Sequence, residues 1–312
     1  MRNTLVQGDD LKWKPTTKKL NDVIDAARGL VALPVGMGTS EWMDGHTEQV
    51  IACANGLVRL ADRELLPHTP EFFNTFALPF AYEPDAGKPE HWLSFLKEVF
   101  PDDLESAETL QEWFGYILSG RTDLQKMLMV VGPPRSGKGT IVRTLIALIG
   151  AESHAAVTDT ALANDFGLAL LVDKTLAVFS DTRVTIKGKK LVETLLSVTG
   201  EDTVPVNRKY RDAVSVRLGV RFMIMSNELP FLPDNSGAIV SRMIALSTPN
   251  SWLGREDPGL CRCAEKRAAR DTELGAGRHE SAGDARASHA ARQRAGNHRS
   301  AERSCQSHKA VR

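Results

Sequence analysis

A glycine-rich segment in the middle of the chain has the residue types that bind phosphate groups. The apolar run Lys126–Val131 precedes the sequence GPPRSGKGT at residues 132–140, and a helical pattern follows over 141–149. This order of strand, glycine-rich loop and helix is typical of a P-loop. The glycines let successive backbone N–H groups point at phosphate oxygens, and Lys138 reaches the β- and γ-phosphates. The alternative is a glycine turn before an ordinary helix.

The predicted phosphate site covers the whole loop. Its residues are Gly132, Pro133, Pro134, Arg135, Ser136, Gly137, Lys138, Gly139 and Thr140. One position departs from the common motif, because Gly139 follows the lysine where Ser or Thr usually binds Mg²⁺. Thr140 comes one place later and is the candidate metal ligand from the loop. The same Gly-Lys-Gly-Thr order also occurs in adenylate-kinase-like loops.

The metal partner of such a loop is a carboxylate at the end of another strand. The apolar run Thr175–Ser180 ends in Asp181, which is the Walker B candidate for binding Mg²⁺. In a parallel sheet this position lies at the edge where ligands bind. The alternative is an aspartate that caps a turn. Thr182 follows, so the usual second acid is absent, and Glu193 and Glu201 are the candidates for activating water or else ordinary surface carboxylates.

Two further polar residues flank predicted strands. The run Val220–Ser226 ends in Asn227, whose amide is suited to orient the attacking water or to sense the γ-phosphate. The alternative is a turn-forming asparagine. Arg242 precedes the predicted strand Met243–Leu246 and is a candidate arginine finger that reaches the nucleotide of a neighbouring subunit. Its alternative is a surface arginine.

Residues 203–216 form a predicted β-hairpin with a basic tip. Alternating valines flank the tip, as expected for two half-buried strands. Basic side chains track a phosphate backbone and an aromatic ring stacks on a base. The candidate DNA-binding residues are Arg208, Lys209, Tyr210 and Arg211. The alternative is a solvated hairpin tip.

These residues require an α/β framework. From Gln125 onwards, short apolar runs alternate with glycine turns and helical stretches, which predicts a parallel sheet. Before it, amphipathic patterns over Leu20–Val31, Trp92–Phe100 and Ala107–Leu118 predict a mostly helical region. Asp102, Asp103 and Ser106 are suitable N-terminal caps for the last of these helices. The four phenylalanines of Pro70–Phe80 fit either one helix face or a buried corner.

Composition limits the function classes. The 312 residues suffice for two domains, and 39 basic against 39 acidic residues exclude a uniformly basic nucleic-acid coat. No apolar run approaches the roughly 20 residues that span a bilayer, and the N-terminus lacks the apolar stretch of a secretory signal. Four cysteines are too few for a disulfide framework. We therefore expect a cytoplasmic protein, in a bacterium or a phage-infected host, with no membrane partner.

The last part of the chain differs from the rest. Residues 261–312 hold 12 basic and 6 acidic residues, and Leu274 and Val311 are their only large apolar side chains. Such a segment cannot offset the entropy of ordering, so we predict a disordered tail. The predicted organisation is a linker or partial segment at 1–48, a helical domain at 49–120, a P-loop ATPase core at 121–260 and the tail at 261–312.

Taken together, these motifs resemble the superfamily 3 helicase domain of phage and plasmid primase-helicases. The resemblance rests on GPPRSGKGT, SDTR, GED with the NRKY hairpin, SNELP and SGAIVSR, in that order. Upstream, NGLVRL, LLPHTPEFFNTFALPFAY and LQEWFGYILSG resemble the helical domain that precedes this ATPase, also in poxvirus-type NTPases. The similarity covers roughly residues 50 to 260. It implies an AAA+-like P-loop fold.

The resemblance also implies roles and partners. Asp181 would be the Walker B carboxylate, Asn227 the motif C sensor and Arg242 the finger that acts across a subunit interface. Arg208 and Lys209 would lie on a hairpin that grips DNA in a central channel. ATP and Mg²⁺ are the implied cofactors, and single-stranded DNA and a ring of identical subunits, typically a hexamer, are the implied partners.

The chain departs from this family at both ends. No primase domain precedes the helical region, so we expect no priming activity, and the tail after residue 260 does not continue with the family's helices. One hypothesis is that the tail is read in a shifted frame, and the coding DNA would test it. Under that hypothesis Cys261, Cys263, Cys305 and His308 are accidental neighbours rather than a zinc site.

Two alternatives to a working helicase remain open. The first is a truncated remnant that binds ATP without unwinding DNA. The second is a small-molecule phosphotransferase, suggested by the Gly-Lys-Gly-Thr loop. That enzyme class needs an arginine-rich lid after the P-loop helix, and Ala151–Asp165 offers none.

Overall fold

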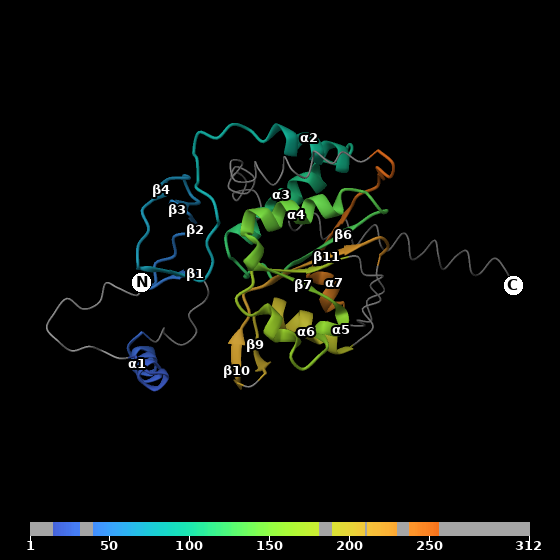
Figure 1. Cartoon of the computed structure of the whole chain (residues 1–312). Helices are drawn as coiled ribbons and strands as arrows, with labels where there is room; N and C mark the ends of the chain where they lie inside the picture. The colour runs from blue at the N-terminus through green and yellow to red at the C-terminus, as the bar shows by residue number, and fades with distance from the viewer. Residues whose placement is uncertain (1–14, 32–39, 181–188, 210, 230–236, 256–312) are drawn as a thin grey trace. The chain divides into compact units, whose positions relative to one another are not determined.

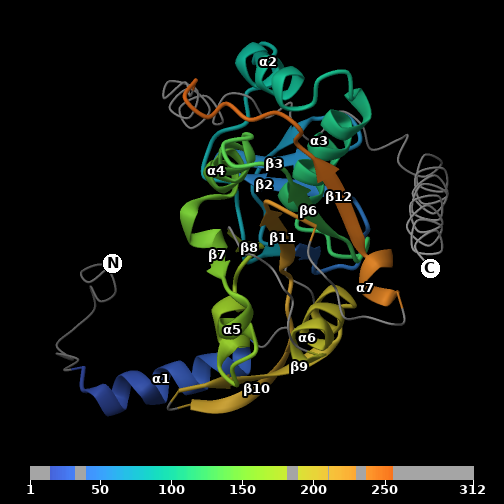
Figure 2. The same ribbon diagram turned by 90° about the vertical axis from the view of Figure 1, so that its right-hand side faces the viewer.

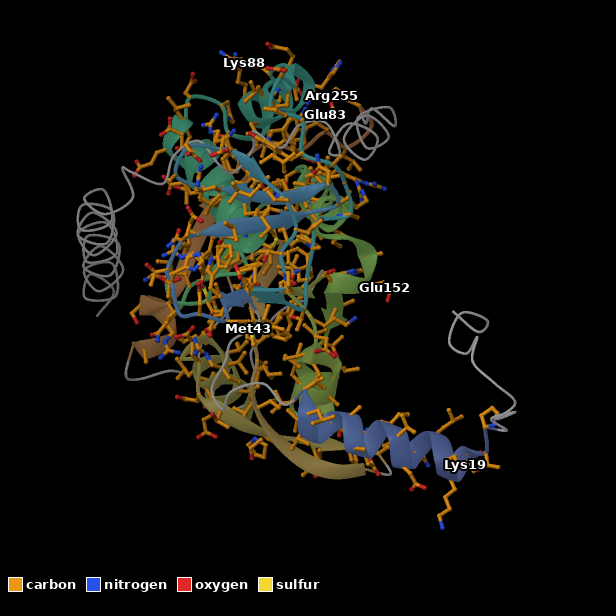
Figure 3. All side chains as sticks on the ribbon, turned by 90° about the vertical axis from the view of Figure 1, so that its left-hand side faces the viewer. Lys19, Met43, Glu83, Lys88, Glu152 and Arg255 are labelled. Carbon is orange, nitrogen blue, oxygen red and sulfur yellow. The ribbon has the colours of Figure 1, made fainter. Side chains whose placement is uncertain are left out.

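The computed structural model describes residues 15–31, 40–180, 189–209, 211–229 and 237–255, and they fall into two compact units, Met1–Gly38 and Thr39–Arg312. The first unit contains helix α1 (Thr17–Leu30), which confirms the helix predicted from residue 20. Thr16 caps it by accepting a hydrogen bond from the Lys19 amide. None of its residues is buried, and its side chains project on all sides (Figure 3).

The second unit is built on a five-stranded parallel sheet, as predicted (Figure 1). Its strand order is β12-β6-β11-β8-β7, and every neighbouring pair is parallel. The strands are β6 (Met127–Val131), β7 (His154–Val157), β8 (Leu176–Phe179), β11 (Arg221–Ser226) and β12 (Met243–Ser247). After β6 the chain crosses to β7 at one edge of the sheet and then forms β8 and β11. It then crosses to the other side of β6 and forms β12 at the opposite edge. The carboxyl end of β6 is therefore a topological switch point, where open α/β sheets bind ligands.

Helices cover both faces of this sheet (Figures 1 and 2). On one face, Leu128 and Val130 share a core with residues of α2 (Glu90–Val99), α3 (Leu104–Leu118) and α4 (Lys138–Ile149). On the other face, Met127 and Met129 pack with residues of α5 (Asp159–Leu162) and α6 (Lys189–Thr199). Alternate residues of the same strand thus enter opposite cores, which explains why the strand is apolar throughout.

Short elements complete this unit. The 3₁₀ turns are η1 (Ala151–Ser153) and η2 (Gly167–Leu171), and α7 (Ala238–Ser241) leads into β12. The predicted hairpin is present as β9 (Thr203–Arg208) and β10 (Arg211–Arg217), which pair antiparallel. At the start of α3, Asp103 accepts a hydrogen bond from the Ser106 amide, so the predicted cap is confirmed there.

The region before the P-loop contains the two predicted helices and also strands that the sequence analysis did not anticipate. These are β1 (Ser40–Trp42), β2 (Val50–Cys53), β3 (Gly56–Arg59), β4 (Leu65–Leu66) and β5 (Phe72–Asn74). Residues 70–80 are a buried corner and not a helix, with Phe72 and Phe80 in the core. Strands of two to four residues leave too few alternations for their period to be read from the sequence.

A buried arginine ties this region to the sheet. Arg221, at the start of β11, donates from Nη2 to the Ile117 carbonyl at 2.6 Å and from Nη1 to the Gly120 carbonyl at 3.2 Å. Its guanidinium also lies over the Tyr116 ring, 5.7 Å from the centroid. Burial lowers the pKa of Arg221 to about 10, and the carbonyls at the end of α3 offset part of that desolvation. β11 is thereby fixed to the C-terminal end of α3.

The described part of the chain contains no helix that is both long and apolar enough to cross a membrane. Cys53, the cysteine within it, is buried and free, and burial raises the pKa of its thiol to about 12. The predicted disordered tail and its cysteines lie outside the described residues.

Candidate nucleotide site

The glycine-rich loop leaves the carboxyl end of β6 and leads into α4, as predicted. The Gly132 amide donates to the Ser226 carbonyl at 3.2 Å, so the loop begins against the end of β11. Gly137 is the N-cap of α4 and has a φ of 92°, a left-handed conformation that glycine adopts without strain. The N-terminus of α4, with its positive dipole end, therefore lies at the switch point.

The predicted phosphate lysine and the predicted sensor lie together. Lys138 Nζ donates to Asn227 Oδ1 at 3.1 Å, and also to the carbonyls of Gly132 at 2.6 Å and Pro133 at 2.8 Å. Lys138 begins α4 after the loop that leaves β6, and Asn227 directly follows the neighbouring strand β11, 89 positions later in the chain. The loop's own carbonyls thus hold the ammonium group in the position from which it can transfer to a phosphate oxygen.

Two glycines of the loop are required by close packing. A Cβ on Gly132 would lie 2.1 Å from Thr248 Oγ1 and 2.2 Å from the Thr248 carbonyl oxygen. A Cβ on Gly137 would lie 2.9 Å from a methyl of Val99 and 3.2 Å from the Phe95 ring. Gly132 thus packs against the segment after β12, and Gly137 packs against α2. The region before the sheet is in direct contact with the phosphate loop.

A short segment after β12, residues 248–252, binds the outer side of the loop, and we call it the clasp. The Thr248 amide donates to the Val131 carbonyl at 2.8 Å, and the Trp252 amide donates to that of Arg135 at 3.0 Å. Ser251 Oγ donates to the Pro134 carbonyl at 2.7 Å. The clasp therefore binds two carbonyls of the loop, those of Pro134 and Arg135.

A buried pair of hydroxyl groups also joins the clasp to the loop. Ser136 Oγ and Thr248 Oγ1 are 2.7 Å apart, and both residues are almost fully buried. Lys138 Nζ lies 3.3 Å from the same Ser136 oxygen. Two hydrogen bonds through the Ser136 hydroxyl therefore link Thr248 to Lys138.

The loop fits Mg²⁺ less well than it fits a phosphate. Gly139 brings no oxygen to the position after the lysine, and Thr140 Oγ1 accepts a hydrogen bond from Arg143 Nη2 at 3.3 Å. Asp181, the predicted Walker B ligand, lies outside the described residues. Within those residues, no group of three or more His, Cys, Asp or Glu side chains is arranged to hold a metal ion. We therefore assign no step to a metal.

The other predicted catalytic residues lie elsewhere. The Arg242 carbonyl accepts from the Met127 amide, so Arg242 sits at the amino end of β6, opposite to the loop. Its Nη1 donates to the Leu196 carbonyl and to Thr199 Oγ1 at the end of α6. Any contact of Arg242 with a nucleotide would therefore involve a neighbouring subunit.

Neither candidate for activating water is in the described site. Glu201 Oε1 accepts hydrogen bonds from Thr122 Oγ1 and Arg217 Nη2, near the amino end of β6. This position is at the amino end of the sheet, and the loop leaves its carboxyl end. Glu193 is exposed on α6.

The basic hairpin is separate from the loop. Val204 and Val206 of β9 are buried, and they alternate with the exposed residues Thr203, Pro205 and Asn207. Arg208 is half-buried and Lys209 is exposed. Tyr210 and the side chain of Arg211 lie outside what the structure describes. Where described, the tip presents basic side chains without any contact to the nucleotide loop that would restrict their position.

Sequence reasoning missed two parts of the site. The clasp has no motif, because its contacts use backbone groups and small hydroxyls. Arg143 could have been found from the sequence. It lies four residues after Gly139, and so on the same helix face as position 139, where the common P-loop has a Ser or Thr hydroxyl.

Two family models match the chain in adjoining parts. One, described as D5 N terminal like, matches residues 15–101. The other, a family of unknown function (DUF5906), matches residues 130–242, which include the loop, Asn227 and Arg242. The first match extends across α1 and the strands before α2.

Solved structures of the NrS-1 C-terminal region share the fold. The A form apo structure is 17% identical with a TM-score of 0.58, and the match covers 85% of this chain and 61% of that one. The A form apo structure of residues 305–718 gives 16% and 0.55, with 84% and 61% covered. A further apo structure of 305–718 gives 18% and 0.54, with 83% and 61% covered. This chain thus spans about three fifths of the length of those structures.

Proposed function

We propose that this chain is the ATP-driven motor region of a replication protein of the primase-helicase type, from a phage or a plasmid. The observation that carries the proposal is the pairing of Lys138 Nζ with Asn227 Oδ1 at 3.1 Å, at the mouth of a P-loop. A lysine for the phosphates and an amide that can orient water are two of the parts that phosphoryl transfer to water uses. The D5 N terminal like match and the likeness in fold to the NrS-1 C-terminal region support the same assignment.

In the proposed reaction, water attacks the γ-phosphate of ATP in line with the leaving oxygen. Lys138 moves from the loop carbonyls to the phosphate oxygens and offsets the charge that develops there. The N-terminus of α4 and the loop amides add to this stabilisation, which acts without reorganisation because the clasp already fixes the loop. Asn227 orients the attacking water through its amide. ATP is therefore the proposed nucleotide, and Mg²⁺ with Asp181 remains a sequence prediction.

The proposed partners are single-stranded DNA and further copies of this chain. Lys209 and Arg208 on the hairpin would contact the phosphate backbone. A ring, with six subunits as the expected number, would bring Arg242 of one subunit to the nucleotide of the next. Such a protein would act in the cytoplasm of a bacterium or an infected host. The proposal applies to the motor part, since the chain covers only part of the matched structures.

Steady-state ATP hydrolysis, with and without single-stranded DNA, tests this function. We expect hydrolysis that DNA stimulates, and a fall of about 100-fold in Lys138→Ala, because a charge-assisted contact to phosphate is lost. Lys88→Ala is the matched control, because Lys88 is exposed near the start of α2, as Figure 3 shows, and it should hydrolyse ATP normally.

Two other results would reject the motor. Hydrolysis that persists in Lys138→Ala would come from a contaminant or from another site. Nucleotide binding that depends on Lys138 but leads to no hydrolysis would instead identify a remnant that binds ATP without turning it over.

A further inference from the structure

We propose that Arg143 is a phosphate-binding residue of the nucleotide site, and that its guanidinium takes the place of the hydroxyl group that the common P-loop carries after its lysine. This inference rests on the proposed function, because it concerns how that site holds a triphosphate. It starts from the one position at which the loop departs from the common motif, Gly139. With Arg143 in this role, nucleotide binding depends less on Mg²⁺ than in a P-loop that has Ser or Thr at position 139.

The geometry at Gly139 carries the argument. A Cβ built on Gly139 would lie 3.1 Å from Arg143 Nη1 and 3.8 Å from Cζ. The guanidinium of Arg143 therefore folds back by one helical turn and covers the place from which a serine side chain would extend. Arg143 Nη2 also donates to Thr140 Oγ1 at 3.3 Å. The hydroxyl of Thr140, at the end of the loop, therefore accepts a hydrogen bond from Arg143.

The electrostatics of α4 point to an anion at this place. Its first turn contains no acidic residue and begins with Lys138, and Arg143 reaches back to the same turn. Positive side chains are unfavourable at a helix N-terminus, where the backbone already presents partial positive charge. Two cations over this turn become favourable when a polyanion binds there. A triphosphate at the loop supplies that charge.

A guanidinium can do part of what a metal ion does. It carries a permanent positive charge and a planar fork of N–H donors that matches phosphate oxygens. Arg143 is exposed, so a ligand at the loop can reach its guanidinium. Glycine at 139 leaves the guanidinium in this place, whereas a side chain there would make it shift by a few tenths of an ångström.

Equilibrium binding of a fluorescent methylanthraniloyl ATP, in Mg²⁺ and in EDTA, tests this inference. We expect the wild-type chain to bind in EDTA nearly as well as in Mg²⁺. In Arg143→Ala the affinity in EDTA should fall about 10- to 100-fold, as expected for a charge-assisted phosphate contact, with a smaller fall in Mg²⁺. Arg143→Lys should retain part of the affinity, since it keeps the charge but loses the fork.

A double variant separates a phosphate role from a structural one. Gly139→Ser combined with Arg143→Ala restores the common motif without a clash, and its affinity should recover in Mg²⁺ but not in EDTA. Arg28→Ala is the matched control, because Arg28 is also exposed on a helix and donates to Asp25, three residues away, at 2.8 Å. It should bind nucleotide like the wild type.

The outcomes distinguish this inference from the function on which it rests. If Arg143→Ala binds as the wild type does in EDTA while Lys138→Ala loses binding, Arg143 is not a phosphate ligand and the P-loop assignment stands. If Lys138→Ala also binds normally, the nucleotide site itself is wrong. A lower Tm of Arg143→Ala with unchanged affinity would overturn the inference in favour of a purely structural contact.

Discussion

The phosphate loop and the basic hairpin are both candidate binding elements, and the protein fixes them very differently. The loop contacts β11, α2 and the clasp, and Gly132 and Gly137 lie where a Cβ would be too close to a neighbouring atom. The hairpin is held by its antiparallel pairing and by two buried valines, while Lys209 at its tip is exposed. The loop is therefore packed against three elements, whereas the hairpin exposes Lys209 at its tip.

This difference matches what each element has to recognise. A transferring phosphoryl group requires donors in fixed positions, so that little reorganisation accompanies the reaction. A DNA backbone is a repeating chain of charges, and a protein that follows it needs positive charge more than fixed geometry. We therefore expect substitutions in the loop to affect folding and nucleotide binding together, and those in the hairpin to affect DNA binding alone.

The largest effect should come from Gly132→Ala. Its Cβ would meet the backbone oxygen of Thr248, which cannot move without disturbing the pairing of β12 with β6. We expect a loss of about 1–3 kcal/mol in the free energy of unfolding, as in other overpacked cores, together with loss of nucleotide binding. Thermal unfolding and calorimetric binding measure both.

Gly87→Ala is the control for that substitution, since no atom lies within 4 Å of a Cβ placed there. It should leave both quantities unchanged. A stable Gly132→Ala protein that binds ATP normally would show that the clasp does not restrict the loop.

A smaller effect is expected for Thr248→Val. This change keeps the shape and the amide contact with Val131 but removes the hydroxyl that pairs with Ser136. The buried Ser136 hydroxyl then loses a partner, and we expect about 1 kcal/mol less binding energy for ATP, or about fivefold in Kd. Titration calorimetry measures it, and an unchanged Kd would limit the clasp to its backbone contacts.

The smallest effect on the nucleotide site should be that of Lys209→Ala. Its side chain is exposed at the hairpin, so stability and ATP affinity should not change. Binding of single-stranded DNA should weaken, and the slope of log K against log salt should fall by about 1, as for one lost phosphate contact. Anisotropy titrations at several salt concentrations measure this, and an unaltered slope would remove Lys209 from the DNA surface.

The parts of this fold that were predictable are those whose residue types are dictated by chemistry or by burial. Asn227 was predicted as a strand-end amide, and the structure brings it to Lys138 because β6 and β11 are neighbours. The apolar runs of β6, β8, β11 and β12 were recognisable because both faces of the sheet are covered.

Other features had no signal of this kind. The strands of residues 40–74 are too short to show a period, and their pairing depends on contacts distant in sequence. The position of Arg242 at the end of α6 depends on strand order, which one sequence does not specify. The backbone contacts of the clasp require no particular side chain at Trp252, so no motif marks them.

The most direct test of the account is a structure of this chain with a non-hydrolysable ATP analogue. We predict that the triphosphate lies in the loop, that Lys138 Nζ leaves the carbonyls of Gly132 and Pro133 for phosphate oxygens, and that Asn227 faces the γ-phosphate. A nucleotide bound elsewhere, or a Lys138 still held by those two carbonyls beside a bound nucleotide, would contradict it.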